Sequence, residues 1–282
     1  MSALPAVLIT GASTGIGAAC ALHLADRGYR VYAGYRDLPA QSEARILPVR
    51  LDVTQTQDWQ AVVEKIASEN PESGLFALVN NAGIGLGGPI EYLPLEKFRQ
   101  QFEVNFFAVI QGIQICLPLL RQGSPGKIVN ISSVNGQIIT PFLSPYCSSK
   151  FALEALTESL RHELAPWKID CSLIQPGMVQ TPIFIKSQHL FSELKNQIPE
   201  QGLKDYSEVF AAFEDLLGRI SGKGIPPLAV AETLLKILNS PHPRLRYPVG
   251  KDAKIGLFLR KVLPDTLFES LLRKISIARS PR

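Results

Sequence analysis

A serine, a tyrosine and a lysine stand close together in the sequence, at Ser133, Tyr146 and Lys150. If residues 146–150 are helical, the phenol and the ammonium lie side by side on one face of the helix. A free tyrosine has a pKa near ~10, too high for proton transfer at neutral pH, and a neighbouring cation lowers it. Lowering that pKa by roughly 3 units requires about 4 kcal/mol. The three residues therefore suit general acid/base chemistry with Tyr146 as the proton carrier.

These side chains can act together only if secondary-structure elements position them, and the hydrophobic pattern predicts such elements. Short apolar, β-branched runs alternate with helical stretches. This alternation predicts an α/β fold, a doubly wound parallel sheet of about seven strands with helices on both faces. Ligands of such sheets bind outside the carboxyl ends of the strands. Candidate residues fall at these ends, namely Gly11, Asp52, Asn80, Ser133 and Pro176.

The first expected strand, residues 6–10, opens into a glycine-rich turn at residues 11–17 and then into a helix. Glycines let the backbone turn tightly and approach a pyrophosphate, which rests on the helix N-terminus. The spacing is Gly-x-x-x-Gly-x-Gly, and it favours a dinucleotide site over a plain glycine turn.

The second expected strand, residues 30–35, ends where an NAD site usually carries an acidic residue for the ribose 2′-hydroxyl. Arg36 follows instead, and its guanidinium can pair with a 2′-phosphate. We therefore expect NADP(H) rather than NAD(H) as the cofactor. Asp37 is the next residue, where it could serve NAD(H) or form a salt bridge with Arg36.

Asparagines stand at two further positions of interest. The expected strand at residues 75–79 runs into NNAG, residues 80–83, which could hold an irregular turn or be an ordinary loop. Asn105 lies inside a predicted helical region, residues 95–120, formed by one long helix or two abutting ones. Asparagine is unfavourable in the middle of a helix, so Asn105 either faces solvent or has a task.

The composition is that of a folded globular protein, with 282 residues of which 46% are hydrophobic and 19% charged. The four cysteines lack disulfide-like or metal-like spacing, so we expect reduced thiols, a cytoplasmic location and no metal site. No uninterrupted apolar run reaches the ~18 residues of a transmembrane helix. Residues 251–282 hold eight Lys or Arg against three Asp or Glu, a surplus of +5; since the net charge is +4, the rest of the chain sums to −1. This distribution argues against a nucleic-acid partner. We expect a single domain, residues 1–282.

Two late segments depart from the alternating pattern. Residues 183–227 carry apolar clusters at the ligand edge of the sheet, and we expect a helical substrate lid there; a subunit contact or a surface helical pair is the alternative. Residues 252–279 form an amphipathic basic segment, in which Leu267, Leu271 and Ile275 recur at helical spacing. That segment could lie on an anionic membrane surface. We favour the alternative, in which it packs over the substrate mouth or across a subunit interface.

With these residues in view, the chain resembles the short-chain dehydrogenase/reductase family over essentially its whole length. The resemblance is carried by TGASTGIG (residues 10–17), Asp52-Val53, NNAG, Asn105, Ser133, YCSSK (residues 146–150) and PGMVQT (residues 176–181). It implies a Rossmann-type sheet and an oxidoreductase that uses a nicotinamide dinucleotide. We also expect a homo-oligomer, either a dimer or a tetramer.

The resemblance implies a role for each matched residue. Tyr146 would exchange a proton with the substrate oxygen, and Ser133 would hydrogen-bond that oxygen. Lys150 would hold the nicotinamide ribose and lower the Tyr146 pKa, while Asn105 would anchor a proton-relay water through a kinked helix. Ser132 would point to the other side of the strand end. The implied cofactor-binding residues are Gly11, Ser13, Thr14, Gly15, Ile16, Gly17, Arg36, Asp52, Val53, Asn80, Ala82, Gly83, Tyr146, Lys150, Pro176, Gly177, Val179 and Thr181.

Within the family, the chain looks most like the branch of retinol and 17β-hydroxysteroid dehydrogenases. The cues are GGPIEYLP (residues 87–94), RYPVGKDAK (residues 246–254) and the apolar segment after Pro176. They imply a lipophilic alcohol or carbonyl substrate, retinoid-, steroid- or long-chain-like, and a role in lipid metabolism. Some subfamilies place a basic residue where this chain has Thr14, so the choice of NADP(H) depends on Arg36 alone.

Two other functions remain open from the sequence. One is a 3-oxoacyl or other small-carbonyl reductase of the same family. The other is a non-catalytic dinucleotide-binding sensor on the same fold. A sensor would not need the Ser, Tyr, Lys and Asn set, and this chain keeps all four of these residues.

Overall fold

The computed structural model describes residues 4–39, 45–123, 125–182, 191–193, 195–220 and 223–276. These residues contain one seven-stranded sheet in the order β3-β2-β1-β4-β5-β6-β7, with every neighbouring pair parallel. The chain order reverses between β1 and β4, which confirms the predicted doubly wound sheet. The strands are β1 (Ala6–Ile9), β2 (Arg30–Tyr35), β3 (Ile46–Arg50), β4 (Ala77–Asn80), β5 (Lys127–Ile131), β6 (Asp170–Pro176) and β7 (Arg246–Val249).

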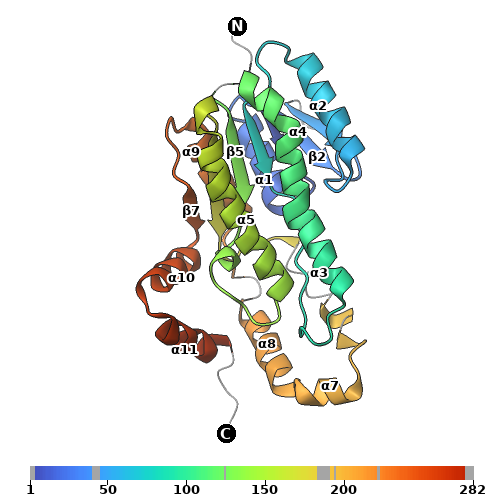
Figure 1. Cartoon of the computed structure of the whole chain (residues 1–282), viewed down its shortest axis with the longest axis vertical. Coiled ribbons are helices and arrows are strands. Elements are labelled where there is room, and N and C mark those ends of the chain that lie inside the picture. Colours follow the sequence, from blue (N-terminus) through green and yellow to red (C-terminus); the bar gives the residue numbers. More distant parts are fainter. Residues whose placement is uncertain are drawn as a thin grey trace.

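Helices cover both faces of this sheet (Figure 1). Along β1, Val7 and Ile9 face one layer and Ala6 and Leu8 face the other, because successive side chains of a strand alternate. Buried on both sides, the central strands β1 and β4 are almost wholly apolar, as parallel strands usually are. The first layer contains α1 (Gly15–Ala25) and α9 (Pro227–Asn239); the second contains α2 (Thr56–Glu69), α4 (Ala108–Gln122) and α5 (Ser144–Glu163).

The predicted helix at residues 95–120 is continuous but irregular. It consists of α3 (Leu95–Phe102), a π-helical turn η1 (Glu103–Phe107) and α4. By length and apolar composition, Leu95–Gln122 is the one helix of the described residues that could cross a membrane, a feature that the search for uninterrupted apolar runs did not reveal. In this fold, Val109, Ile113 and Cys116 are buried in the core. The segment is therefore a core helix of the α/β domain.

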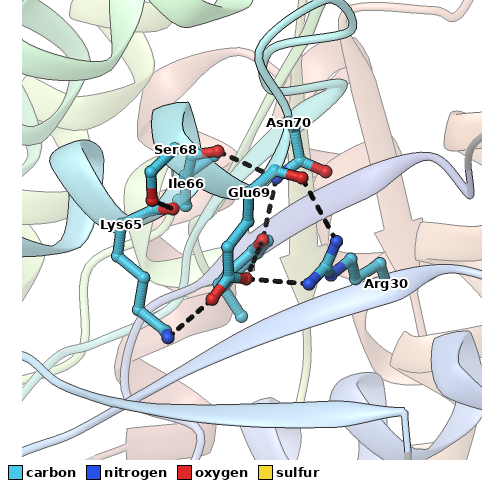
Figure 2. A network of polar contacts seen from close by, with 7 residues as sticks. Arg30, Lys65, Ile66, Ser68, Glu69 and Asn70 are labelled. Atoms are coloured by element: carbon cyan, nitrogen blue, oxygen red, sulfur yellow. Dashed lines mark hydrogen bonds and ion pairs between the residues drawn. The ribbon is translucent and has the colours of Figure 1, made fainter.

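The C-terminal end of α2 is fastened to the sheet by a polar network (Figure 2). Glu69 accepts hydrogen bonds from Lys65 at 2.7 Å, Arg30 at 2.8 Å and Tyr32 at 2.7 Å. Asn70 donates to the Tyr32 hydroxyl at 2.8 Å. These contacts, led by the bond from Lys65, hold the pKa of Glu69 below its ordinary value against the opposing effect of burial. The network fixes the side of the sheet where β2 and β3 lie.

The region predicted as a lid contains helices α7 (Glu200–Asp205) and α8 (Ser207–Ile220), which lie beyond the ends of α3 and α5 (Figure 1). Phe191, Phe210 and Phe213 form a separate apolar cluster there, against Phe142 of the loop before α5. Residues 183–190, 194 and 221–222 of the predicted lid lie outside the described residues, as do the side chains of Leu216 and Leu217.

The basic C-terminal segment forms α10 (Lys251–Val262) and α11 (Asp265–Ser276), at the same end of the molecule as α8 (Figure 1). Phe268 of α11 is 5% exposed, whereas Ile255 and Phe258 of α10 are 60% and 63% exposed. One apolar face of α11 is therefore covered, and an apolar stripe of α10 is not. The Ile275 side chain and residues 277–279 lie outside the described part of this segment.

Candidate active site

A cavity of about 1120 Å³ opens at the carboxyl ends of the strands. Ligand sites commonly measure about 300–1,000 Å³, so this cavity has room for a dinucleotide and a substrate together. All four expected catalytic residues line it, and so do all the expected cofactor-binding residues except Gly17 and Asn80. The lining residues that sequence analysis did not single out include Thr54, Ile84 and Asp252.

The turn after β1 is shaped for close approach of a ligand to the backbone. Gly11 has φ +64°, and a Cβ there would lie 2.8 Å from the Ala82 backbone. A Cβ on Gly17 would lie 2.3 Å from the carbonyl oxygen of Gly11, so Gly17 packs beneath the turn. No side chain caps the N-terminus of α1 at Thr14, and no acidic residue occupies the first turn of that helix. These features suit a pyrophosphate, because the N–H groups and dipole at a helix start attract an anion.

The structure separates the roles of the two adjacent asparagines after β4. Asn80 is buried in the sheet and donates to Asn130 Oδ1 at 2.8 Å, so it does not line the cavity as expected. Asn81 donates to the carbonyl oxygens of Thr10 and Gly11, both at 2.9 Å. It is therefore Asn81 that fastens the glycine turn to β4. The sequence places the end of β4 only to within one residue. A difference of one residue determines whether Asn80 or Asn81 points towards the cavity.

At the opposite rim from the catalytic residues, Arg36 and Asp37 both lie exposed at the end of β2 and line the cavity. Asp52 stands at the next strand end, where its Oδ1 accepts from the backbone and hydroxyl of Thr54 at 3.0 and 2.8 Å. This rim therefore offers one cation and two carboxylates to the adenosine end of a dinucleotide.

Ser132 and Ser133 face different partners at the end of β5. Ser132 Oγ donates to Glu154 Oε1 at 2.7 Å. Ser133 Oγ accepts from the backbone N–H of Asn135 at 3.1 Å, and it hydrogen-bonds the hydroxyl of Tyr146. The expectation that Ser133 rather than Ser132 meets the tyrosine agrees with this arrangement.

The pKa of Tyr146 departs from its ordinary value in the direction opposite to the one expected from sequence. Burial raises it, and the hydrogen bond from Ser133 only partly opposes that effect. The ammonium of Lys150 lies 5.8 Å from the Tyr146 ring centroid and donates to the carbonyl oxygen of Ile131 at 2.8 Å. Within the protein itself, the desolvation of Tyr146 outweighs the influence of its neighbours.

Lys150 is itself desolvated, with 5% of its surface exposed. Burial lowers its pKa from 10.5 to about 8, and the carboxylate of Glu154 acts in the opposite direction. A lysine in this state is still largely charged at neutral pH. It can therefore present positive charge to the phenol and hydrogen-bond donors to a ribose.

Asn105 lies in the π-helical turn and is 1% exposed. Its amide accepts from Ile84 N at 2.9 Å and donates to Ile84 O at 3.0 Å, so it pairs with the loop after β4. It also donates to Ser149 Oγ at 3.3 Å, and Ser149 donates to the carbonyl oxygen of Tyr146 at 2.8 Å. The mid-helix asparagine thus has a task. The kink implied by the family resemblance is this turn, a feature frequent at functional sites.

The loop after β6 is held from below by Asp252, which sequence analysis did not single out. Asp252 Oδ2 accepts from the backbone N–H of Met178 at 2.8 Å. A Cβ on Gly177 would lie 2.1 Å from the same carboxylate, and one on Gly250 would lie 2.4 Å from Oδ1. Gly250 has φ +106°, so glycine is required where β7 turns into α10. The pattern Gly-Lys-Asp within residues 246–254 was the signal for this carboxylate.

Apart from the polar residues Gln100, Glu103, Asn135 and Thr140, the remaining wall of the cavity, beyond Ser133 and Tyr146, is apolar. It contains Ile138, Ile139 and Leu143 from the loop before α5, Phe191 and Phe213 from the lid region, and Leu272 from α11. Among the described lining residues, Arg36 and Lys150 are the only cations. This end of the cavity therefore suits an uncharged, lipophilic group.

The aromatic part of that wall depends on Phe142. Its ring centroid lies 5.9 Å from that of Phe191, 5.2 Å from Phe210 and 5.4 Å from Phe213. Phe142 has φ +64°, an unfavourable conformation for a bulky residue. Its carbonyl oxygen accepts from Gly88 N at 2.7 Å. Phe142 thus links the loop between Ser133 and α5 to the lid region.

The chain is similar to known oxidoreductases over most of its length. The chain is 37% identical over 279 residues to an uncharacterized oxidoreductase, YusZ, of Bacillus subtilis, covering 95% of this chain and 96% of that protein. It is 35% identical to retinol dehydrogenase 5 of Mus musculus, covering 94% and 87%. It is 33% identical to the NADPH-dependent 3-dehydrocapnine reductase of Ornithobacterium rhinotracheale, covering 95% of each chain.

Among solved structures, a short-chain dehydrogenase from Streptomyces avermitilis has the same fold, with a TM-score of 0.76 at 24% identity over 97% of each chain. The family model described as short chain dehydrogenase matches residues 5–189, which include β1 to β6. That segment carries the glycine turn, Asn105, Ser133, Tyr146 and Lys150. The chain belongs to the short-chain dehydrogenase/reductase family and is an oxidoreductase.

Proposed function

We propose that this oxidoreductase interconverts a lipophilic alcohol and its ketone or aldehyde, with NADP(H) as the cofactor and Tyr146 as the acid/base. The observation that carries the proposal is the cavity itself. It joins an anion-binding glycine turn, the Ser133, Tyr146 and Lys150 cluster, and an apolar wall. The substrate is retinoid-, steroid- or long-chain-like.

The mechanism follows from the positions of these residues. A bound nicotinamide dinucleotide would be held by the turn at residues 11–17, the loop at residues 176–181 and Lys150, and it supplies or accepts the hydride. Ser133 and Tyr146 donate hydrogen bonds to the substrate oxygen, where negative charge develops during reduction. Tyr146 then delivers its proton to that oxygen, and Lys150 stabilises the phenolate that remains. Asn105 and Ser149 hold the backbone of Tyr146 in place.

The apolar wall supports a lipophilic substrate over a small polar carbonyl compound. Two relatives that match the chain almost end to end are named for retinol and for 3-dehydrocapnine. The substrate of a small-carbonyl reductase would leave the apolar side chains of Ile138, Ile139 and Leu143 uncovered. Turnover of a series of ketones, aldehydes and alcohols of increasing chain length distinguishes the two. We expect kcat/KM to rise with chain length; a preference for the shortest carbonyls would favour the alternative.

Catalysis itself is tested by Tyr146→Phe. Removing the phenol should reduce kcat by at least ~10²-fold, which is the usual contribution of a positioned general acid. NADPH binding, followed by the fluorescence of the reduced nicotinamide, should persist. Unchanged turnover would exclude Tyr146 as the proton donor. Cofactor binding by the wild-type protein without turnover of any compound in the series would favour the non-catalytic sensor.

The choice of NADP(H) rests on Arg36, which lies at the rim where a 2′-phosphate would stand. One relative is named as NADPH-dependent. Arg36→Leu should weaken NADPH binding by about 10-fold or more, in keeping with the loss of a charge-assisted contact, and should leave NADH binding nearly unchanged. Asp37→Asn serves as the adjacent control and should not weaken NADPH binding. Tighter binding of NADH than NADPH by the wild-type protein would refute the assignment.

For the C-terminal segment, we favour packing over the substrate mouth for α11, because Phe268 is buried and Leu272 lines the cavity. The exposed stripe of α10, Ile255, Phe258 and Val262, is flanked by Lys251, Lys254 and Lys261. Such a face suits an anionic membrane surface, from which a lipophilic substrate could enter. The buried free thiols favour a cytoplasmic location for such a peripheral protein.

Vesicle co-sedimentation tests this surface. Binding to phosphatidylserine-containing vesicles should exceed binding to purely zwitterionic vesicles, and Phe258→Ser should reduce it. Leu22→Ser provides a matched control, because Leu22 is also exposed but lies on α1. Equal binding to both vesicle types, or no effect of Phe258→Ser, would refute the membrane contact. The C-terminal segment would then serve only to pack α11 over the substrate mouth.

A homo-oligomer, dimer or tetramer, completes the proposal. Phe107 of the π-helical turn and Phe151 of α5 are 52% and 41% exposed on two elements that contact each other. A second copy of the chain would cover them. Light scattering coupled to gel filtration should give a dimer or tetramer mass, and Phe151→Glu should shift it towards the monomer.

A further inference from the structure

A carboxylate one helical turn beyond Lys150 is buried and heavily hydrogen-bonded. Glu154 of α5 is 4% exposed. Its Oε1 accepts from Ser132 Oγ at 2.7 Å and from Gln175 Nε2 at 3.0 Å. Its Oε2 accepts from Arg246 Nε at 2.8 Å and from Gln137 Nε2 at 3.4 Å. Buried carboxylates are costly unless paired in this way, so each of these partners is held in place.

Two partners of Glu154 come from the strand ends that carry Ser133 and the Pro176–Gly177 turn. Ser132 immediately precedes Ser133 at the end of β5, and Gln175 immediately precedes Pro176 and Gly177 at the end of β6. Lys150 shares the helix face of Glu154, because the two stand four residues apart on α5. Arg246 extends the set to β7, where it also pairs with Glu158 at 2.8 Å. One carboxylate therefore connects both strand ends to the catalytic helix.

We infer that Glu154 is a positioning residue: it fixes Ser133 and the Pro176–Gly177 turn around the reacting atoms and keeps a negative charge behind the ammonium of Lys150. This inference rests on the proposed function of Ser133, Tyr146 and Lys150. Glu154 does not line the cavity, so it acts through its neighbours. In this way it differs from the catalytic residues.

The charges around Glu154 decide the pH behaviour. Lys150 and Glu158 approach it from α5 and Arg246 from β7. The other groups that bond it are neutral: Ser132 of β5, Gln175 of β6 and Gln137, the residue after η2 (Val134–Gly136). Glu154 raises the pKa of Lys150 against the dominant effect of burial. Without that carboxylate, Lys150 would lose its proton at a lower pH. Both turnover and cofactor binding would then decline earlier as the pH rises.

The test compares Glu154→Gln with Glu158→Gln. Both changes remove a carboxylate that pairs with Arg246, but the Glu158 side chain is 52% exposed and that of Glu154 is 6% exposed. We expect Glu154→Gln to lower kcat by about 10-fold or more with a smaller change in KM, and to move the alkaline limb of the kcat profile to lower pH. Glu158→Gln should leave both unchanged. Glu154→Asp, which keeps the charge, should restore the position of the alkaline limb but only part of kcat.

NADPH affinity as a function of pH provides a readout that needs no substrate. Glu154→Gln should weaken NADPH binding increasingly above neutral pH, relative to the wild type. A variant with lower thermal stability but unaltered kcat and pH profiles would show that Glu154 is only structural.

If Glu154→Gln fails to fold, Ser132→Ala removes one of the four hydrogen bonds to Glu154 and should lower kcat several-fold. An unchanged kcat would overturn the inference. Absence of turnover in the wild type would refute the proposed function, and the pH dependence of NADPH binding would still decide the role of Glu154.

Discussion

Lys150 illustrates, at the scale of one residue, how this site trades stability for chemistry. Its ammonium is buried beside the partly buried phenol of Tyr146, and its pKa falls to about 8. Below that pH the folded and unfolded chains both carry the charge, so the full cost of burying it is present. Between pH 8 and 10.5 the unfolded chain binds more protons at this lysine than the folded chain. Stability from this group is therefore lacking at neutral pH and is regained as the pH rises through that window.

Lys150→Met should consequently make the folded protein more stable at pH 7. The difference between 10.5 and about 8 corresponds to about 3 kcal/mol, and the lost hydrogen bond to Ile131 offsets about 1 kcal/mol of it. We expect a gain of roughly 2 kcal/mol in the free energy of unfolding, measured by urea denaturation. The gain should shrink towards pH 10. A loss of stability at pH 7 would show that the ammonium contributes more through its contacts than its burial costs.

At this scale the sequence predicted which residues lie together but not how the site shifts their pKa values. The alternation of a strand distinguished Ser133 from Ser132, and helical spacing placed Lys150 beside Tyr146. Glu154 was missed because a glutamate one turn from a lysine looks like an exposed helix pair. Its burial depends on Arg246 of β7, far along the chain. The direction of the Tyr146 pKa was wrong for the same reason, since burial is a property of the assembled site.

At the scale of elements, the close contact of α2 and α4 sets the position of the helix that carries Asn105. A Cβ on Gly112 would lie 2.4 Å from the ring of Trp59, which is fully buried. Gly112→Ala should therefore destabilise the fold by about 1–3 kcal/mol through overpacking. Gly218→Ala is the matched control, because it lies in α8 with nothing within 4 Å of the added methyl group. That change should stabilise the protein by about 0.5–1 kcal/mol. The melting temperatures of both variants test this. If both substitutions shifted the melting temperature in the same direction, the packing argument would be wrong.

Phe142 connects the loop before α5 to the lid region. The contribution of its ring and the cost of its positive φ can be measured separately. Phe142→Gly relieves the φ of +64° and removes the ring, whereas Phe142→Ala removes the ring and keeps the unfavourable conformation. Both should raise KM for long-chain substrates about 10-fold while leaving kcat for short ones nearly unchanged. Phe142→Ala should also melt at a lower temperature than Phe142→Gly. Equal KM values for long substrates in wild type and both variants would show that the aromatic wall does not contact the substrate.

Elements with strong local signals were predicted well, and those defined by distant partners were not. The β-branched runs and the glycine turn predicted the strands and the start of α1. The family resemblance implied a kink at Asn105, but its form, a π-helical turn in which Asn105 pairs with Ile84 21 positions away, could not be predicted from local sequence. The amphipathic pattern of residues 252–279 predicted an apolar face but not which surface covers that face. Only the fold shows that Phe268 is buried.

For the whole molecule, the parallel doubly wound sheet could be predicted because short apolar strands alternate with helical stretches along the chain. The two helical layers are separate apolar cores on opposite faces of the sheet. Cys20 lies in the layer of α1 and α9, and Cys116 and Cys171 lie in the layer of α2, α4 and α5. Burial raises the pKa of each of these three thiols to about 12.

The reactivity of these cysteines therefore reports local opening of the two helical layers. In the folded protein they should resist alkylation at pH 8, because they are both inaccessible and protonated. Any modification by iodoacetamide then records a moment when one layer separated from the sheet. Peptide mass spectrometry after timed exposure should show Cys116 and Cys171 reacting together, with Cys20 following its own rate. Identical rates for all three would mean that the two layers come apart from the sheet as a single unit.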